Sequence, residues 1–146
     1  MNAAARLMAR RFWKDVLLCT LGSLGLMGCG GSPSGTPVKL PGASPGIGFD
    51  DLRYSPSLHR VLVPAGRSGR LDLIHPDTLQ VSSIDGFSSK TGYSGGHDDG
   101  PTSVEEALGK LYVTDRTNQT LLVVDPASSK IIGSVKLEAS PDYVRF

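Results

Sequence analysis

The sequence predicts an all-β protein built from two similar units of short strands. One stretch, RVLVPAGRSGRLDLIHPDTLQVSSI at residues 60–84, has a second copy, KLYVTDRTNQTLLVVDPASSKIIGSV, at residues 110–135. In both copies short apolar runs rich in branched side chains alternate with turns that contain Gly, Pro or Asn. A sequence period near 50 residues with three or four strands per unit is typical of a β-propeller.

The first unit is predicted to cover residues 49–87. The segment 65–69, AGRSG, suits a hairpin turn, and Pro76 ends a strand because proline supplies no backbone donor to a sheet. We expect strands at the apolar runs on either side of these turns, 52–54, 61–63, 71–74 and 81–84.

The second unit, 101–138, aligns with the first at an offset of 50 residues up to the Pro turn, and at an offset of 51 after it. The matches are Leu58 with Leu108, Val63 with Val113, Leu71 with Leu121, and Pro76 with Pro126. Several runs are apolar on successive residues, which indicates sheets that are packed on both faces. Residues 88–100 are expected to form the loop between the units. The end of the chain, 139–146, repeats the strand at 52–54 and is predicted to begin a third unit.

The stretch LysLeuTyrValThrAsp, residues 110–115, resembles the YVTN repeat, with Asp115 where Asn is usual. The first copy departs from that motif at residues 62–65. Its assignment as a repeat therefore depends only on its pattern of apolar runs and turns. The resemblance covers residues 49–146 and implies a β-propeller, usually of seven blades.

Because a ring needs at least about four blades, we expect this chain to be the front part of a longer protein. The alternative is a short protein that completes its ring by association, and an isolated pair of units is expected to fold poorly, aggregate or oligomerise.

The first residues, 1–28, are predicted to be an export signal. Arginines and a lysine precede an apolar stretch of 13 residues, which is too short to span a bilayer as a helix. The stretch ends in Leu26-Met27-Gly28-Cys29, which resembles the lipobox of bacterial lipoproteins. The resemblance implies cleavage before Cys29 and attachment of lipid to this residue. The remaining cysteine, Cys19, follows a large residue and is a poor competing cleavage point.

A lipidated Cys29 implies a protein of the cell envelope whose membrane partner is reached through the lipid. Gly30 after the cysteine favours the outer over the inner membrane, by the sorting rule of enteric-type bacteria.

Residues 29–48 are rich in Gly, Pro and Ser and are expected to form a disordered tether; a packed irregular arm is the alternative. No disulfide partner remains in the mature chain, and a formal net charge of +1 with no basic cluster argues against nucleic-acid binding.

The dense polar cluster GlyGlyHisAspAspGly, 95–100, is the candidate ligand-contact loop. His97, Asp98 and Asp99 could approach a metal ion, but they lack the alternating carboxylates of a calcium loop and the further His or Cys of a zinc site. We therefore expect a solvated loop with no metal site and no cofactor, which can still contact a ligand.

Other polar residues suggest no catalytic centre. His59 and His75 are expected at a strand start and a turn, on the surface. Adjacent strand residues point to opposite faces, so neither Asp50-Asp51 nor Glu105-Glu106 can act as an acid/base couple on one substrate. Both pairs are expected to be solvated edges. We therefore predict a module that binds an unidentified protein or small ligand. The alternative is a fragment of an envelope propeller enzyme, either lactonase-like or redox-type, with catalytic residues from several blades.

Overall fold

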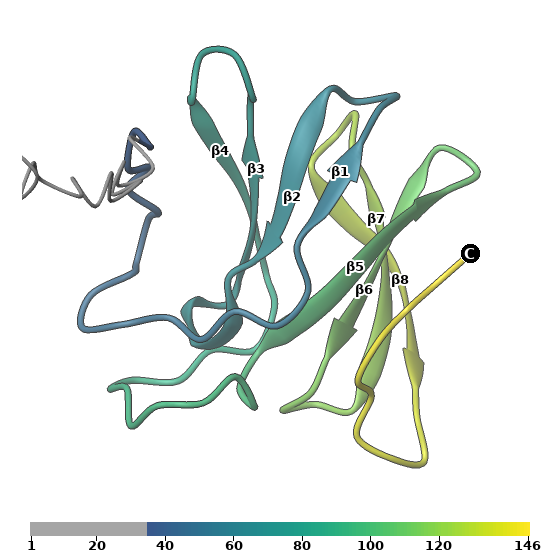
Figure 1. The fold of residues 1–146 in the computed structure, drawn as a ribbon. Helices are drawn as coiled ribbons and strands as arrows, with labels where there is room; N and C mark the ends of the chain where they lie inside the picture. Colours follow the sequence, from purple (N-terminus) through teal and green to yellow (C-terminus); the bar gives the residue numbers. More distant parts are fainter. Residues whose placement is uncertain (1–34) are drawn as a thin grey trace, which may run out of the picture. The chain divides into compact units, whose positions relative to one another are not determined.

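The computed structural model describes residues 35–146, which contain two four-stranded antiparallel sheets (Figure 1). The first sheet has strands in sequence order: β1 (Arg53–Ser55), β2 (Arg60–Pro64), β3 (Arg70–Ile74) and β4 (Val81–Asp85). The second sheet repeats this order with β5 (Pro101–Ala107), β6 (Lys110–Asp115), β7 (Thr120–Asp125) and β8 (Lys130–Lys136). The predicted all-β fold with two four-stranded, propeller-type blades is confirmed.

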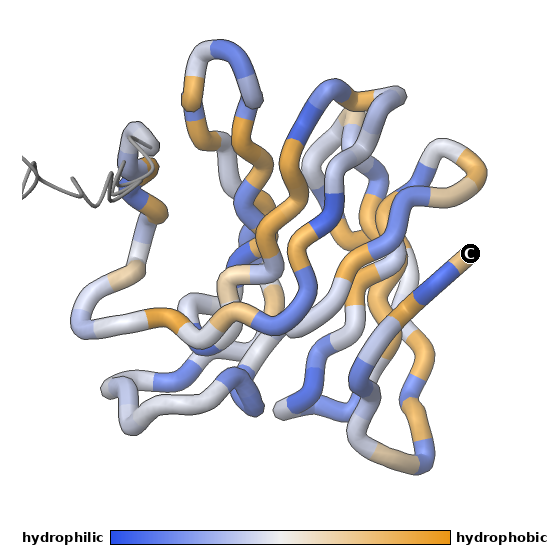
Figure 2. The backbone as a smooth tube through the Cα atoms, viewed as in Figure 1, coloured by the Kyte–Doolittle hydropathy of each residue, from blue (hydrophilic) through white to orange (hydrophobic). Residues whose placement is uncertain are grey.

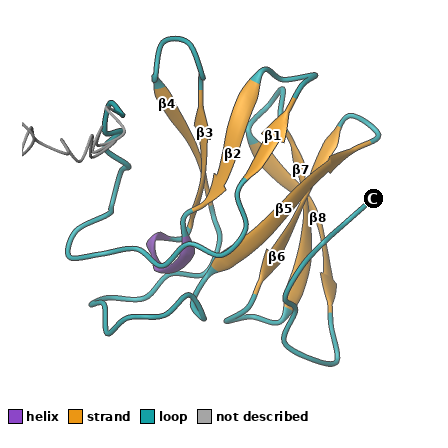
Figure 3. Cartoon of the chain, viewed as in Figure 1, coloured by secondary structure: helices purple, strands orange, loops and turns teal. Residues whose placement is uncertain are grey.

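Short connections explain why each unit folds as an up-and-down sheet. The turn between β2 and β3 contains one 3₁₀ turn, η1 (Gly66–Ser68), and then Gly69 in the left-handed conformation at a φ of 72°. Figure 3 shows this 3₁₀ turn between the strands of the first sheet. At the far end of β3, the backbone N–H of His75 donates to the carbonyl of Gln80 and so closes the turn into β4.

The hydrophobic core lies where one face of the first sheet packs against one face of the second. Residues paired across an antiparallel ladder lie on the same face. The first sheet contributes two such pairs, Leu62 with Leu73 and Leu71 with Ile84. The second sheet contributes Val104, Leu111, Val113 and Val124. Figure 2 shows that hydrophobic residues gather along the strands, whereas the loop 88–100 is mostly hydrophilic or neutral.

Buried polar contacts also join the two sheets. The carboxylate of Asp115, at the end of β6, accepts hydrogen bonds from the backbone N–H of Ser88 at 2.7 Å and from its hydroxyl at 2.5 Å. It also accepts the backbone N–H of Asn118 at 3.1 Å. Because Asp115 is fully buried, these donors compensate for the loss of water around its charge. Asp115 therefore ties the segment that follows β4 to the second sheet.

Two sequence-based expectations about irregular segments need correction. Residues 37–48, expected to belong to a disordered tether, form an irregular arm that lies against the first sheet. The buried guanidinium of Arg67 donates to the carbonyls of Gly46 at 2.5 Å and Gly42 at 3.5 Å. A charged side chain can therefore hold a segment that has no apolar period.

The segment 139–146 does not form the predicted strand of a third unit, because no neighbouring strand offers it a ladder of backbone bonds. It is fixed by the N–H of Val144, which donates to the hydroxyl of Ser103 in β5 at 3.1 Å. The predicted export signal 1–28 and Cys29 lie outside the described residues. Within 35–146, no helix is long and apolar enough to cross a membrane.

Candidate functional site

The predicted ligand-contact loop does not bring His97, Asp98 and Asp99 to a common point. The imidazole Nδ1 of His97 lies 3.4 Å from a carboxylate oxygen of Asp50. Asp98 instead pairs with Arg116 at 3.2 Å, and Asp99 pairs with Lys90 at 3.0 Å. In this conformation the three side chains therefore face three different partners and not one common point.

The hollow beside this loop is also very small. Its volume is about 10 Å³, and its lining comprises Gly48, Arg67, Tyr93, Gly96, His97 and Asp99. A space of about 10–15 Å³ holds at most one water molecule. The loop therefore offers no enclosed space for a small organic ligand in the described structure.

Asp50 and Asp51 are not the solvated edge that the sequence suggested. Their side chains are only 9% and 11% exposed, respectively. Asp51 accepts two hydrogen bonds from the guanidinium of Arg145, at 2.7 and 3.1 Å, and one from the hydroxyl of Ser103 at 2.7 Å. The Tyr143 hydroxyl donates to Asp50 at 3.4 Å, and the negative charge of Asp50 raises the pKa of Tyr143. These contacts hold the end of the chain against the segment that precedes β1 and against β5.

The two glutamates of β5 are likewise engaged. Arg53 of β1 donates to Glu105 at 2.8 Å. Glu106 accepts hydrogen bonds from the hydroxyls of Ser55 and Ser57. Both carboxylates therefore connect the two sheets, and neither is the solvated edge that the sequence suggested.

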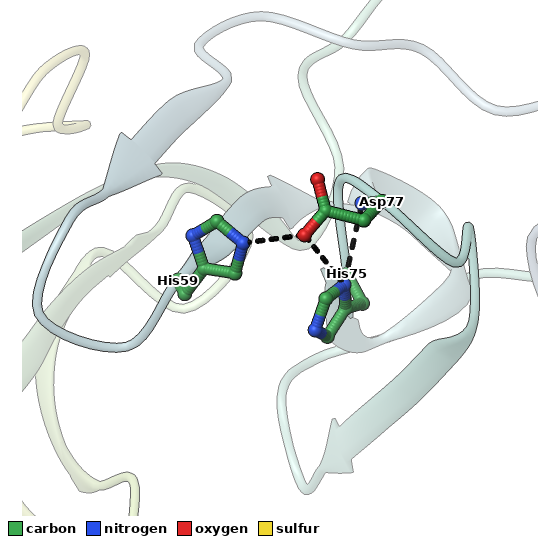
Figure 4. Close-up of side chains that lie close together, drawn as sticks. All are labelled: His59, His75 and Asp77. Carbon is green, nitrogen blue, oxygen red and sulfur yellow. Dashed lines mark hydrogen bonds and ion pairs between the residues drawn. The ribbon is translucent and has the colours of Figure 1, made fainter.

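A second group of polar side chains, which the sequence did not predict as a site, lies at the end of the first sheet away from loop 88–100. It comprises His59, His75 and Asp77 (Figure 4). His59 immediately precedes β2, and His75 immediately follows β3. Because β2 and β3 are antiparallel neighbours with Val61 paired to Ile74, the start of β2 and the end of β3 lie side by side. The turn after β3 then returns Asp77 to the same place.

Direct contacts join these three residues. Nε2 of His59 is 2.8 Å from Oδ2 of Asp77, and Nδ1 of His75 is 3.8 Å from the same oxygen. The two imidazole rings meet edge to face, with 5.1 Å between their centroids. The hydrogen bond to His59 lowers the pKa of Asp77, so that its carboxylate is ionised at neutral pH.

Sequence reasoning missed this group because its members are 2 to 18 residues apart and match no known ligand spacing. The sequence signal that could have indicated the group is the position of the two histidines relative to the predicted strands. Two histidines that flank consecutive strands of a predicted hairpin, one before the first strand and one after the second, must come to the same edge of the sheet. His59 and His75 satisfy this condition about β2 and β3.

Solved structures with similar folds exist, although no family model matches the chain and no curated protein is detectably similar to it. The structure of Citrobacter koseri AztD superposes with a TM-score of 0.58 at 20% identity, covering 77% of this chain and 30% of that one. Apo AztD from Citrobacter koseri gives a TM-score of 0.52 at 21% identity, covering 64% of this chain and 24% of that one. Kuenenia stuttgartiensis hydrazine synthase gives 0.53 at 17% identity, covering 77% and 29%.

At these identities the similarity shows the fold alone, which is of the β-propeller type. This chain spans less than a third of the length of each of those structures. The similarity therefore supports two adjacent propeller blades, and it assigns no activity.

Proposed function

We propose that this chain is a lipid-anchored propeller module of the cell envelope, with YVTN-type repeats, that acts by binding a partner or small ligand. The observation that carries the proposal is the sequence Leu26-Met27-Gly28-Cys29 directly after a short apolar stretch. A Gly- and Pro-rich segment follows, and then the two sheets. This order is that of a protein attached to a membrane by its amino-terminal lipid and displayed beyond it.

Several acidic side chains are already bonded to other residues of the chain, which favours a binding protein over an enzyme. General acid–base chemistry needs a carboxylate or imidazole within reach of a substrate. Asp51, Glu105 and Glu106 are instead held by cations or hydroxyls that connect segments of the fold. Among residues 35–146, these groups serve packing between the sheets.

The test of the anchor uses the two cysteines of the chain as a matched pair. In its bacterial host, the wild-type protein and a Cys19→Ser variant are expected to incorporate labelled palmitate and to remain with the membrane fraction. A Cys29→Ser variant is expected to lose both properties, because the thiol that accepts the lipid is gone. Intact mass of the membrane-extracted wild-type protein showing an unmodified Cys29 would contradict the proposal.

A further inference from the structure

The group formed by His59, His75 and Asp77 has the chemical composition of a metal centre. One ligand atom from each residue lies within 4.8 Å of the others. Two imidazole nitrogens and one carboxylate oxygen suit zinc and similar divalent transition ions, whereas calcium and magnesium prefer oxygen ligands alone. The donor set therefore selects a class of ion.

The distances are close to those that a tetrahedral ion requires. With metal–ligand bonds of about 2.0 to 2.1 Å, neighbouring ligand atoms around zinc lie about 3.3 Å apart. The two separations from Oδ2 of Asp77, 2.8 Å to His59 and 3.8 Å to His75, fall on either side of this value. Shifts of about half an ångström would bring these two separations to the tetrahedral value. The two imidazole nitrogens lie within 4.8 Å of each other, and rotation of their side chains would bring both onto the ion.

Tyr54 supplies the support that metal-bound histidines usually have. Its hydroxyl is 2.7 Å from Nδ1 of His59, the ring nitrogen that does not face Asp77. When Nε2 binds a metal, Nδ1 carries the proton and can donate it to the tyrosine oxygen. Such an outer hydrogen bond fixes the tautomer and the orientation of the ring.

The charge of the group also favours a cation. The carboxylate of Asp77 is 71% exposed and offers an oxygen ligand beside the two imidazoles. The nearest ion pairs of Asp77 are with the two histidines themselves, and among the described residues no Lys or Arg pairs with it. The cation would thus meet one carboxylate and two imidazole nitrogens. Nδ1 of His75 accepts the backbone N–H of Asp77 at 3.3 Å and would exchange that contact for the ion.

We propose that His59, His75 and Asp77 form a binding site for one zinc ion, with Tyr54 as the outer partner of His59. Three protein ligands leave at least one coordination position open for water or a further ligand, as in exchangeable and catalytic zinc sites. The half-exposed side chain of His59 and the exposed Asp77 place this open position toward solvent. The inference concerns the hairpin of β2 and β3 and is independent of the proposed lipid anchor.

The experiment titrates zinc chloride into the full chain in detergent, with both cysteines alkylated so that thiols cannot bind metal. The chain has three histidines, which provides an internal control. We expect one zinc ion per wild-type chain and the same for His97→Ala. In His59→Ala and His75→Ala the affinity is expected to fall by more than about 100-fold, and in Tyr54→Phe by about tenfold.

Cobalt(II) added in place of zinc gives a second readout, since its visible absorption reports the coordination geometry. The variants His59→Gln and His75→Gln repeat the test with polar side chains of similar size, and far-UV circular dichroism confirms the fold of each protein. Zinc binding that is equal in all the histidine variants, or that is lost in His97→Ala, overturns the proposal. Absence of stoichiometric binding by the wild-type chain also overturns it.

Discussion

The two sheets carry equivalent residues at an offset of 50 positions, yet the same side chain has a different environment in each. Leu71 of β3 is fully buried, whereas its equivalent Leu121 of β7 is partly exposed. The reverse holds for the opposite face, where Leu111 of β6 is fully buried and its equivalent Val61 of β2 is partly exposed.

The burial of two equivalent residues therefore differs because the neighbouring sheet covers a different face of each sheet. The face of the first sheet that holds Leu71 is covered by the second sheet, and the face of the second sheet that holds Leu111 is covered by the first. The further face of the first sheet still buries Val63 and Asp72, whereas the further face of the second sheet holds Leu121 and Val135, which are partly or largely exposed. The contribution of a residue to stability should therefore follow its face more closely than its strand.

The largest expected effect compares two identical leucines. Leu71→Ala is expected to lower the free energy of unfolding by about 3 kcal/mol, because it removes a buried side chain and leaves a cavity. Leu121→Ala at the equivalent position should cost about 1 kcal/mol, since water already reaches part of that side chain. Urea unfolding followed by circular dichroism measures both, and equal losses would show that the neighbouring sheet does not determine the contribution.

The next effect concerns Asp115, whose equivalent in the first sheet is Ala65. Asp115→Ala is expected to lower the free energy of unfolding by about 2 to 3 kcal/mol, because three donors lose their buried acceptor. The control is Asp125→Ala, which removes a partly exposed carboxylate that accepts hydrogen bonds from Ser128 and from Lys110. If the control lowers the urea midpoint as much as Asp115→Ala does, the proposed tie between the sheets is wrong.

A smaller and pH-dependent effect is expected at Asp72 of β3, where the second sheet has Leu122. Asp72 is fully buried, and Ser83 donates to one of its oxygens at 2.5 Å. The other oxygen has no hydrogen-bond partner among residues 35–146. Burial raises the pKa of this carboxyl in the folded state. The protonated form therefore suits the fold, and stability present below the ordinary pKa is lost as the pH rises through the folded value.

Replacing Asp72 with Leu, the residue of the second sheet, should therefore stabilise the protein at pH 7, by about 1 kcal/mol. The gain should shrink toward pH 3, where the carboxyl is protonated in both states. Asp72→Asn serves as the control, because it removes the charge and keeps a polar partner for Ser83. Thermal melting across this pH range checks the prediction, and a gain that is independent of pH would contradict the role of the charge.

The smallest effect on stability is expected on the exposed face of β8. Val135→Lys should change the free energy of unfolding by less than about 0.5 kcal/mol, because the side chain of Val135 is already more than half exposed. It should nevertheless reduce self-association, since it places a charge on an apolar face. Ser134→Lys, on the other side of the same strand, is the control. Sedimentation velocity that shows no difference between the two variants would mean that this face does not mediate association.

Much of the fold could be predicted because the repeat is read directly from local patterns. The strands, the turn at 65–69 and the division into two sheets follow from apolar runs and turn residues. The packing of residues 37–48 could not be predicted, because it depends on one guanidinium, that of Arg67, reaching carbonyls more than 20 residues away. The prediction of a strand in 139–146 was wrong because it also depended on distant residues. A strand requires a partner strand as well as a suitable sequence.

The candidate site was predicted less well. The loop residues His97, Asp98 and Asp99 are adjacent in sequence, but separate partners hold them apart. His59, His75 and Asp77 are separated in sequence, and the register of one hairpin brings them together. Side-chain convergence of this kind depends on which strands pair, and composition alone does not contain that information.

The hairpin origin of the His59 group also has a consequence for the order of folding. His59 and Asp77 are 18 residues apart, whereas the contact between Asp51 and Arg145 spans 94 residues. Hairpins form within about 1 to 10 μs, and contacts between distant residues form later because they close larger loops. The three proposed metal ligands are therefore expected to assemble while the ends of the chain are still apart, so that an ion could bind before the rest of the fold is complete.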